Sequence, residues 1–531
     1  FIRLLGAADK TVALRSALES PSLEQGKQVF IVDPTSFTAV PRTPFAYWVS
    51  DDFLDKFRVF QPFESDGRVA QRALSTNNDF RYLRLSWERF ADQALTRPAS
   101  GWFPFAKGGQ FSRFYADIYL IVNWIDEGRE IEAEAIKKFP YLKGNASWVM
   151  HRECNYIRPG ITWPRRTQGG LSVRIMPTGC LFADKGPSAF VEGDSSKELC
   201  SLLAIINSST FRAFVDLQMA FGSFEVGVIQ RTPVPELSAA DREALAGLAR
   251  RAWALKRSLD TRNETSHAFE LPALLSCIRN ASSVRAEVSK HEYSLAMRAA
   301  MWGEHVKAVE AELVSIQAEI DERCFDLYDI GEEDRRAIAP EKDRPTPTDG
   351  DDASLDSDVY IDEADAEADD GDEADETAAA DTASLTAELV SWAFGAAFGR
   401  FDVRLATGGR EPPPVPEPFD PLPACSAGML TGPDGLPCAA PPEGYPVAFP
   451  SNGILADDPG HPRDIEPLVR SILDTIVFAG QPVEQEICEN LGVKSLREYF
   501  RKPALFFADH LKQYSKSRRK APIYWPLSTA S

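Results

Sequence analysis

The sequence predicts an α+β fold, in which a mixed-sheet domain is followed by a long helical hairpin or coiled-coil spacer and a small helical C-terminal module. Three observations predict this fold. Apolar and polar residues alternate from 171 to 176, as in a half-buried strand. Apolar residues step by four and three from 302 to 327, as in a long helix. Residues 465–511 show a helical pattern with breaks at Gly492 and Pro503.

A chain of 531 residues is too long for one hydrophobic core. We therefore expect five segments, each with its own composition. They are a connector at 1–95, the mixed-sheet domain at 96–236, a helical spacer at 237–335, an acidic flexible linker at 336–383, and the C-terminal module with a basic tail at 384–531.

Residues 1–95 alternate between strand-like and helix-like pieces. Residues 29–32 (VFIV) predict a short strand that ends at an Asp-Pro pair, and SDDFLDKF predicts a helix that begins after Ser50. Asn77 and Asn78 fall in a turn between basic residues. They form either a tight loop tip or a pair of amides that read adenine.

The mixed-sheet domain is expected to carry the strand at 171–176 and one helix at 197–219. The strand's alternation places Arg174 on the face opposite Leu171 and Val173. The helix has apolar residues that share one buried side.

The stretch Lys107–Arg174 interleaves aromatic, basic and glycine residues more densely than a plain core requires. Arginine and lysine neutralise phosphates and read guanine edges, and aromatic planes stack on bases. These residues favour a nucleic-acid recognition surface. They equally fit a mixed sheet with a solvated basic face, and composition leaves both interpretations open.

The spacer is predicted to be helical, with Ser238 and Asp241 as a capping pair at one helix start. The steps from 302 to 327 span about three heptads. They fit a two-helix hairpin packed within the chain, or an interface with a partner helix; we favour the hairpin.

The net charge of −21 is concentrated in one place. Residues 349–376 hold fifteen acidic and no basic residues, so the rest of the chain carries only −6. Such a composition does not bury enough apolar surface to fold, which predicts a flexible linker. Residues 494–520, in contrast, carry a net +7, and tyrosine and tryptophan lie beside them. That signature fits either a solvated face or a phosphate-binding tail.

The eight cysteines form no CxxC pair and no zinc-ligand spacing, so we expect reduced thiols and no metal site. The sequence shows neither a signal peptide nor a membrane span, and we expect a cytoplasmic protein without a membrane partner. None of the common phosphate-loop, dinucleotide, metalloprotease or nucleophile motifs occurs, nor does the (Asn/Asp)-Pro-Pro-aromatic motif of amino-methyltransferases.

Several stretches carry a family resemblance in combination. They are PFAYWVSDDF (44–53) with LSTNNDFRYLR (74–84), WFPFAKGGQFSRFYADIYLIVNWIDEGREI (102–131), RPGITWP and GGLSVRIMPTGCLFADKGPSAF (within 158–190) with LLAIINSSTF (202–211), FEVGVIQRTPVP (224–235) with IDERCFDLYDIGEED (320–334), and the tail from residue 506. Together they resemble the C-terminal half of large adenine-specific DNA methyltransferases of bacterial phage defence and restriction–modification. These are the PglX type of BREX systems, with relatives in DISARM and in single-chain type II enzymes.

The resemblance implies a target-recognition domain, a helical spacer and double-stranded DNA as partner. In that family a preceding domain binds S-adenosylmethionine and methylates adenine N6 of a flipped base. This chain lacks the catalytic motifs, so we expect no catalytic residue and no cofactor within it. The connector at 1–95 would then lead from a methyltransferase domain that is absent here.

The implied DNA contacts fall into three groups. The direct contacts are Lys107, Gln110, Ser112, Arg113, Arg158, Arg165, Arg166 and Arg174. Trp163 and Tyr115 are expected to shape the surface or stack on bases, and Gln110 and Asn123 are candidate adenine readers. The basic tail would hold the backbone through Lys512, Lys516, Arg518, Arg519 and Lys520.

A second hypothesis is a non-catalytic scaffold that recruits other defence-system proteins through the heptad seam and the acidic linker. It predicts a stable protein complex without salt-dependent DNA affinity.

Overall fold

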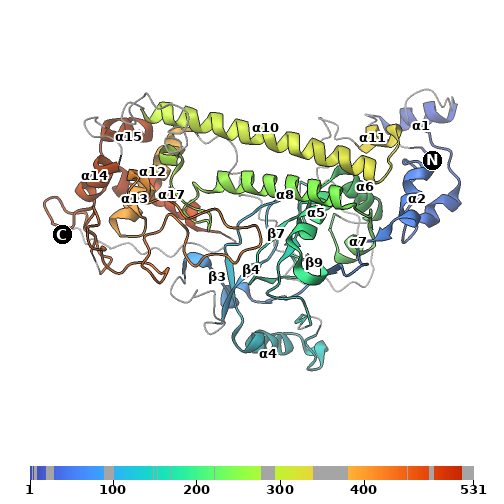
Figure 1. Ribbon diagram of the computed structural model, residues 1–531, viewed down its shortest axis with the longest axis horizontal. Helices are drawn as coiled ribbons and strands as arrows, with labels where there is room; N and C mark the ends of the chain where they lie inside the picture. Colours follow the sequence, from blue (N-terminus) through green and yellow to red (C-terminus); the bar gives the residue numbers. More distant parts are fainter. Residues whose placement is uncertain are drawn as a thin grey trace.

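The computed structural model describes the chain except for residues 3, 5, 6, 8, 20–28, 89–100, 148, 152, 168, 220–221, 277–293, 339–380, 451, 477–482 and 517–531. Two long helices, α8 (Ala239–Asp260) and α10 (Leu295–Leu327), run along one side of the molecule, and the β-strands lie beneath them (Figure 1). The C-terminal helices gather at one end of the long axis, and the N-terminal segment lies at the other.

The strands form two four-stranded sheets and one short pair. The first sheet is antiparallel, with the order β2 (Val69–Gln71), β9 (Ser188–Phe190), β6 (Gly160–Thr162) and β7 (Arg174–Met176). The second has the order β3 (Leu83–Leu85), β5 (Leu120–Asn123), β4 (Trp102–Ala106) and β8 (Leu181–Phe182). The pair joins β1 (Gln61–Pro62) to β10 (Pro233–Val234).

Strands β4 and β8 pair in parallel, with Phe105 opposite Leu181, while the other pairs of the second sheet are antiparallel. This combination confirms the predicted α+β fold with a mixed sheet. Residues 29–32, however, form no strand: Val29 makes one isolated bridge to Ile2, and a 3-10 turn (Pro34–Ala39) begins directly beyond.

The prediction that residues 171–176 are half buried is wrong. Ser172 is 0% exposed and Arg174 is 6% exposed, so both faces of the strand are covered. Val173 and its apolar neighbours of the same face lie in the main core, and Met176 lies in a second cluster with Cys180 on the other side. Alternation alone shows that the two faces differ in polarity; it does not show what covers the polar face.

The single helix predicted at 197–219 is two helices, α5 (Ser196–Ile206) and α6 (Ser209–Gln218). Asn207 separates them because its side chain bonds to the edge of the first sheet. Its Oδ1 accepts from the Val173 main-chain N–H at 2.9 Å, and its Nδ2 donates to the Val173 carbonyl at 2.8 Å. Ser208 then caps the second helix by accepting from the Phe211 N–H.

The two long helices pack within the chain. Helix α8 lies on α5, and α10 lies on α8 and contacts α6 and the C-terminal module. The seam of α10 is buried at Trp302, Val306, Val309, Ile316 and Ile320. This packing fits the hairpin interpretation, since the seam that a partner helix would need is covered by the chain itself.

The remaining helices are short. They are α1 (Lys10–Glu19), α2 (Asp51–Val59), α3 (Asp79–Tyr82), α4 (Arg129–Lys138), α7 (Val226–Arg231) and α11 (Glu332–Ile338). Ser50 caps α2 by accepting from the Phe53 N–H at 3.0 Å, as predicted, and its hydroxyl donates to Asp334 of α11 at 2.6 Å. Ser238 likewise caps α8 at the Asp241 N–H. The predicted acidic linker falls almost wholly outside the described residues.

The C-terminal module is helical around one buried helix. Its elements are α12 (Thr382–Ala397), α13 (Val403–Thr407), α14 (Ile465–Ile476), α15 (Val483–Leu491), α16 (Leu496–Arg501), a π-helical turn (Pro503–Phe507) and α17 (Ala508–Tyr514). The breaks predicted at Gly492 and Pro503 are confirmed. One hydrophobic cluster runs from Phe37 to Phe506, so this module and the sheets share a core.

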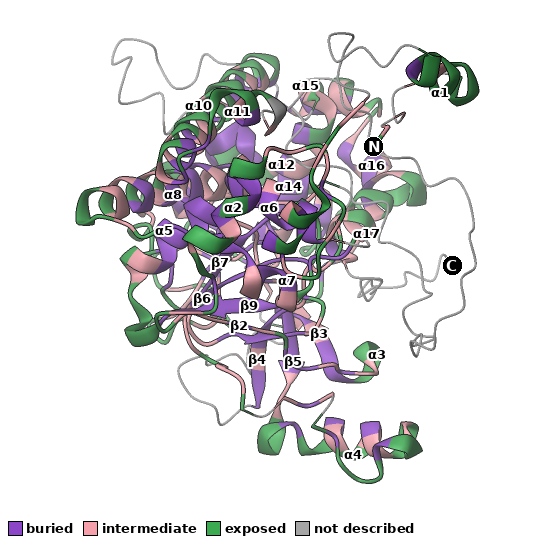
Figure 2. Cartoon of the chain, turned by 90° about the vertical axis from the view of Figure 1, so that its right-hand side faces the viewer, coloured by how far each residue is buried: buried purple, intermediate pink, exposed green. Residues whose placement is uncertain are grey.

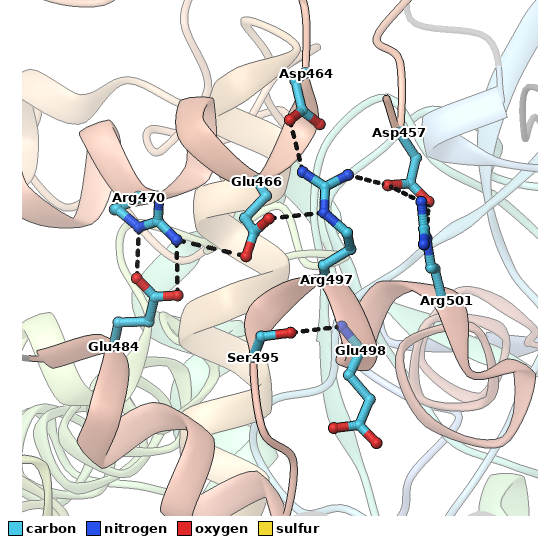
Figure 3. Close-up of polar contacts among 9 residues, drawn as sticks. All are labelled: Asp457, Asp464, Glu466, Arg470, Glu484, Ser495, Arg497, Glu498 and Arg501. Atoms are coloured by element: carbon cyan, nitrogen blue, oxygen red, sulfur yellow. Dashed lines mark hydrogen bonds and ion pairs between the residues drawn. The ribbon is translucent and has the colours of Figure 1, made fainter. Parts of the chain in front are cut away.

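A charged cluster ties α16 to α14 and the loop before it (Figure 3). Arg497 donates from Nη2 to Asp464 at 2.6 Å and from Nε to Glu466 at 2.8 Å, and it also pairs with Asp457. Arg501 shares Asp457 from a more exposed position. Asp464 is only 2% exposed, so its charge depends on Arg497 for compensation.

Among the described helices, none is by itself long and apolar enough to cross a membrane. The bent pair α5 and α6 satisfies the length and composition requirement jointly, with a 67° bend.

Candidate nucleic-acid interface

The loop that follows β4 is held in a conformation that requires glycine. Gly108 has φ +100°, and a Cβ at this position would lie 2.6 Å from the carbonyl oxygen of Lys185. Gly109 has φ +114°. Only glycine adopts such dihedrals without strain. The loop therefore presents Lys107 and Gln110 from a backbone that packs closely against the turn after β8.

Arg174 fixes this loop from inside. Its Nη1 donates to the carbonyl oxygen of Gln110 at 3.0 Å, and its Nη2 donates to that of Gly108. Burial lowers the pKa of Arg174 to about 10. Arg174 was expected to contact DNA directly; its guanidinium is used instead to position the main chain of residues 108–110.

Trp163 and Tyr115 have similar internal roles. Trp163 is 1% exposed, and its Nε1 donates to the carbonyl oxygen of Phe224 at 2.9 Å. The Tyr115 hydroxyl donates to Asp260 of α8 at 2.7 Å. Burial is the main reason that the pKa of Tyr115 lies well above 10. Of the two expected roles, shaping the surface fits this placement. Stacking on a base does not fit Trp163, because neither face of the indole reaches solvent.

Helix α3 brings a carboxylate to the loop. Asp79 forms an ion pair with Lys107 and accepts a hydrogen bond from Thr76. Burial works to raise the pKa of Asp79, but Lys107 outweighs burial and the pKa is lowered. The side chain of Lys107 remains 25% exposed.

The Asn77–Asn78 turn has structural contacts that favour the loop-tip interpretation. Asn77 has φ +55° and donates to the Ser75 carbonyl at 3.0 Å. Asn78 caps α3 through the Arg81 N–H and donates to Glu134 of α4 at 2.8 Å. Helix α4 lies beyond the ends of β4 and β5, at the lower edge of Figure 2.

The two arginines after Trp163 differ in exposure. Arg165 lies between Asp184 at 3.8 Å and Glu225 at 3.7 Å, and its side chain is 15% exposed. Arg166 is exposed. The Arg165 main-chain N–H donates to the Lys185 carbonyl at 3.0 Å, which places Arg166 on a turn beside the glycine loop.

The other expected contacts are scattered. Arg158 donates to Asp194 at 2.7 Å and to the Val191 carbonyl at 2.8 Å, and is 35% exposed. Ser112 donates to the Tyr115 carbonyl at 2.6 Å. Asn123 accepts from the Ile125 N–H at 3.2 Å. Gln110 is exposed.

The basic tail begins beside the second sheet. Lys516 lies over the Tyr119 ring, with Nζ 5.4 Å from its centroid, and Lys512 is exposed. Arg518, Arg519 and Lys520 lie outside the described residues. The structure thus brings Lys107, Gln110, Arg165 and Arg166 together on neighbouring loops, whereas Arg158 lies on another loop and Asn123 ends strand β5.

Sequence reasoning missed three basic residues near these loops. Lys185 is exposed and contributes to the field at Asp79. Arg212 of α6 packs against Gly170. Arg72 lines a cavity of about 930 Å³ together with His151, Glu225 and Gln230. No local pattern marks an isolated basic residue, because its neighbours are set by segments far away in sequence.

The described residues do not fit S-adenosylmethionine. Open α/β folds bind such ligands beyond the carboxyl ends of neighbouring parallel strands, next to a glycine-rich turn into a helix. Here β4 and β8 are the one parallel pair among the named strands, and β8 leads through a turn into β9 rather than into a helix. We derive no methyl-transfer step from these residues.

The comparisons with known proteins point to one class, the adenine-specific methyltransferases. The chain is 24% identical over 353 residues to the adenine-specific methyltransferase PglX of Lacticaseibacillus casei (strain Zhang). The aligned region covers 63% of this chain and 26% of that enzyme. It is 26% identical over 242 residues to the adenine-specific methyltransferase BrxX of Escherichia coli O9:H4 (strain HS). This second aligned region covers 45% of this chain and 18% of that enzyme. The chain therefore matches about a quarter or less of the length of these relatives, and the homology is distant. No family model matches the chain.

Proposed function

We propose that this chain recognises DNA for an adenine-specific DNA methyltransferase that uses S-adenosylmethionine, in a phage-defence or restriction–modification system of the BREX or DISARM type. Methyl transfer itself belongs to a domain that is not among the residues of this chain. The observation that carries the proposal is the similarity to two adenine-specific methyltransferases over as much as 63% of the chain. The residues that the structure describes form no site that fits the methyl donor.

The loop geometry supports this assignment. Lys107 and Arg166 present cations from neighbouring loops, and the exposed Gln110 lies on the same loop as Lys107. Cations bind phosphates, and a glutamine amide can pair with the N6 and N7 edge of adenine. A glycine loop fixed by Arg174 holds these groups in place before DNA arrives, which reduces the entropy lost on binding.

Charge determines how DNA binding would respond to salt. The chain carries −21 overall, of which residues 349–376 supply fifteen negative charges. The few cations of the interface then attract the DNA phosphates, while the acidic residues elsewhere in the chain repel them. Salt screens both the attraction and the repulsion. Counterion release should dominate, so that affinity falls steeply as salt rises.

The test is a gel-shift titration of the full chain on random-sequence duplex DNA at 50 and 200 mM salt, conditions in the range over which such binding typically changes. It is repeated with a separately supplied adenine methyltransferase domain. Salt-sensitive binding by the chain supports the proposal. Absence of binding in every combination contradicts it and favours the scaffold hypothesis.

Deleting residues 349–376 separates the two hypotheses. For a DNA-recognition chain, the deletion leaves affinity intact or raises it, because it removes repulsion. For a scaffold that recruits other defence proteins, the deletion abolishes co-purification of the partner without an effect on DNA.

A further inference from the structure

Arg113 has an unusual environment for an arginine. Its Nε is shielded from solvent and forms no hydrogen bond. Within the described parts of the chain, no carboxylate lies within ion-pair distance of its guanidinium. The neighbour that does approach is the Phe111 ring, whose centroid is 5.6 Å from Cζ. The half-buried guanidinium thus keeps one N–H donor, at Nε, shielded from water and without an acceptor, which is costly.

A second cation makes this environment less favourable still. Burial lowers the pKa of Arg113; the negative charge of Asp321 opposes burial, and the positive charge of Arg212, a smaller influence, lowers the pKa further. Two nearby guanidinium groups repel each other unless an anion lies between them or beside them.

The nearby carboxylates do not fill that role. Asp321 accepts hydrogen bonds from the Ser209 N–H at 2.7 Å and from Gln317 at 3.2 Å. Its carboxylate is therefore already bonded to the main chain at the start of α6. Asp216 is paired with Arg212 at 3.6 Å, which is an ion-pair distance rather than that of a good hydrogen bond. Asp321 acts on Arg113 through its charge alone, and Asp216 is paired with Arg212.

The loop beside the two arginines leaves the main chain accessible. Gly170 has φ +95°, and a Cβ there would lie 2.5 Å from Nη2 of Arg212. The adjacent Gly169 packs against the Phe111 ring in the same way. The glycines therefore allow Arg212 and the Phe111 ring, beside which Arg113 lies, to approach the backbone of this loop closely. The exposed Arg166 precedes the glycines by three residues in the sequence.

We infer that Arg113 and Arg212, beside Gly169–Gly170, form a phosphate-binding site. Guanidinium groups bind phosphate through paired N–H···O bonds, which supplies the acceptors that Arg113 lacks. The ligand is a phosphate oxyanion, either a DNA backbone phosphate or free phosphate. Its assignment to DNA rests on the proposed function; the anion site does not.

Arg212→Gln tests the site without touching the buried Arg113. Arg212 is 40% exposed and its i,i+4 partner is Asp216. Arg323→Gln is the matched control, because Arg323 is 41% exposed and has Glu319 as its i,i+4 partner on α10. Equal Tm values of both variants and the unaltered chain in chloride show that folding is preserved.

The first measurement compares Tm in sodium phosphate and in sodium chloride at equal ionic strength. The unaltered chain and Arg323→Gln should gain about 2 °C in phosphate relative to chloride, and Arg212→Gln should lose that gain. An equal gain in Tm in all three proteins, or no gain in any of them, contradicts the proposed phosphate site.

The second measurement identifies the source of the phosphate. If the site binds a DNA phosphate, Arg212→Gln lowers duplex affinity by about 5-fold and reduces the slope of log affinity against log salt by about one. If Tm depends on Arg212 and duplex affinity does not, the site binds free phosphate. If no protein binds DNA, the proposed function fails, and the Tm comparison still decides the phosphate site.

Discussion

Arg174 donates a hydrogen bond from Nη1 to the main-chain carbonyl oxygen of Gln110 at 3.0 Å. The contact joins the buried edge strand β7 to the loop after β4, and a second bond reaches Gly108. The last basic residue of the stretch Lys107–Arg174, whose composition favours a nucleic-acid surface, thus acts on the protein's own backbone. The exposed loop and the buried arginine are therefore expected to respond differently to substitution.

Arg174→Met should destabilise the chain and weaken DNA binding together. The substitution removes the donors to two carbonyl groups at a position that is 6% exposed. We expect a loss of about 3 kcal/mol in the free energy of unfolding, from two buried acceptors left without partners. Urea denaturation measures it. A stable variant that loses only DNA affinity would contradict the positioning role and indicate direct phosphate contact.

Arg166→Ala should weaken DNA binding without affecting stability. Arg166 is exposed, and surface substitutions typically change stability by less than about 0.5 kcal/mol. Loss of one phosphate contact should lower the salt slope by about one and reduce affinity on all sequences alike. Fluorescence anisotropy with labelled duplexes measures both quantities. Arg251→Ala on α8, whose side chain is 57% exposed, is the control and should change neither.

His267 should make stability depend on pH. Burial tends to lower its pKa, but Asp117, whose Oδ1 lies 2.9 Å from Nδ1, and the nearby Asp260 outweigh burial and raise the pKa. A raised pKa in the folded state means that the stabilisation is complete below histidine's ordinary value of 6.5 and is lost as pH rises through the folded value. Asp260 faces the same cluster, and burial and Asp117 raise its pKa.

The measurement compares the free energy of unfolding of the unaltered chain and of His267→Gln between pH 5.5 and 8.5. The difference should be constant at acidic pH and shrink as pH rises above about 6.5. The Asp260 carboxyl is common to both proteins, so its own effect largely cancels. A difference that grows with pH would show that His267 is held in its neutral form.

Arg497→Met should destabilise the C-terminal module strongly. It leaves Asp464, which is 2% exposed, without its cation (Figure 3). Removing one partner of a buried ion pair costs about 3–5 kcal/mol. Arg501→Met is the control: Arg501 is 55% exposed and shares Asp457, and an exposed pair is worth about 0–1 kcal/mol. An equal loss in the free energy of unfolding in the two variants would show that the burial of Asp464 does not determine how much the ion pair stabilises the module.

Local signals predicted much of the secondary structure. The caps Ser50 and Ser238 and the breaks at Gly492 and Pro503 follow from residues within a few positions of each other. The split between α5 and α6 was missed because Asn207 leaves the helix for a partner on Val173, 34 positions away.

The sequence by itself determined the mixture of helices and strands, the long helix at residues 302–327 and the concentration of basic and aromatic residues between Lys107 and Arg174. Only the tertiary structure decided which of those residues reach solvent. Arg174 bonds to Gln110 across 64 positions, and Trp163 bonds to Phe224 across 61. Burial depends on what packs over a residue from distant segments, and neither composition nor periodicity records that packing.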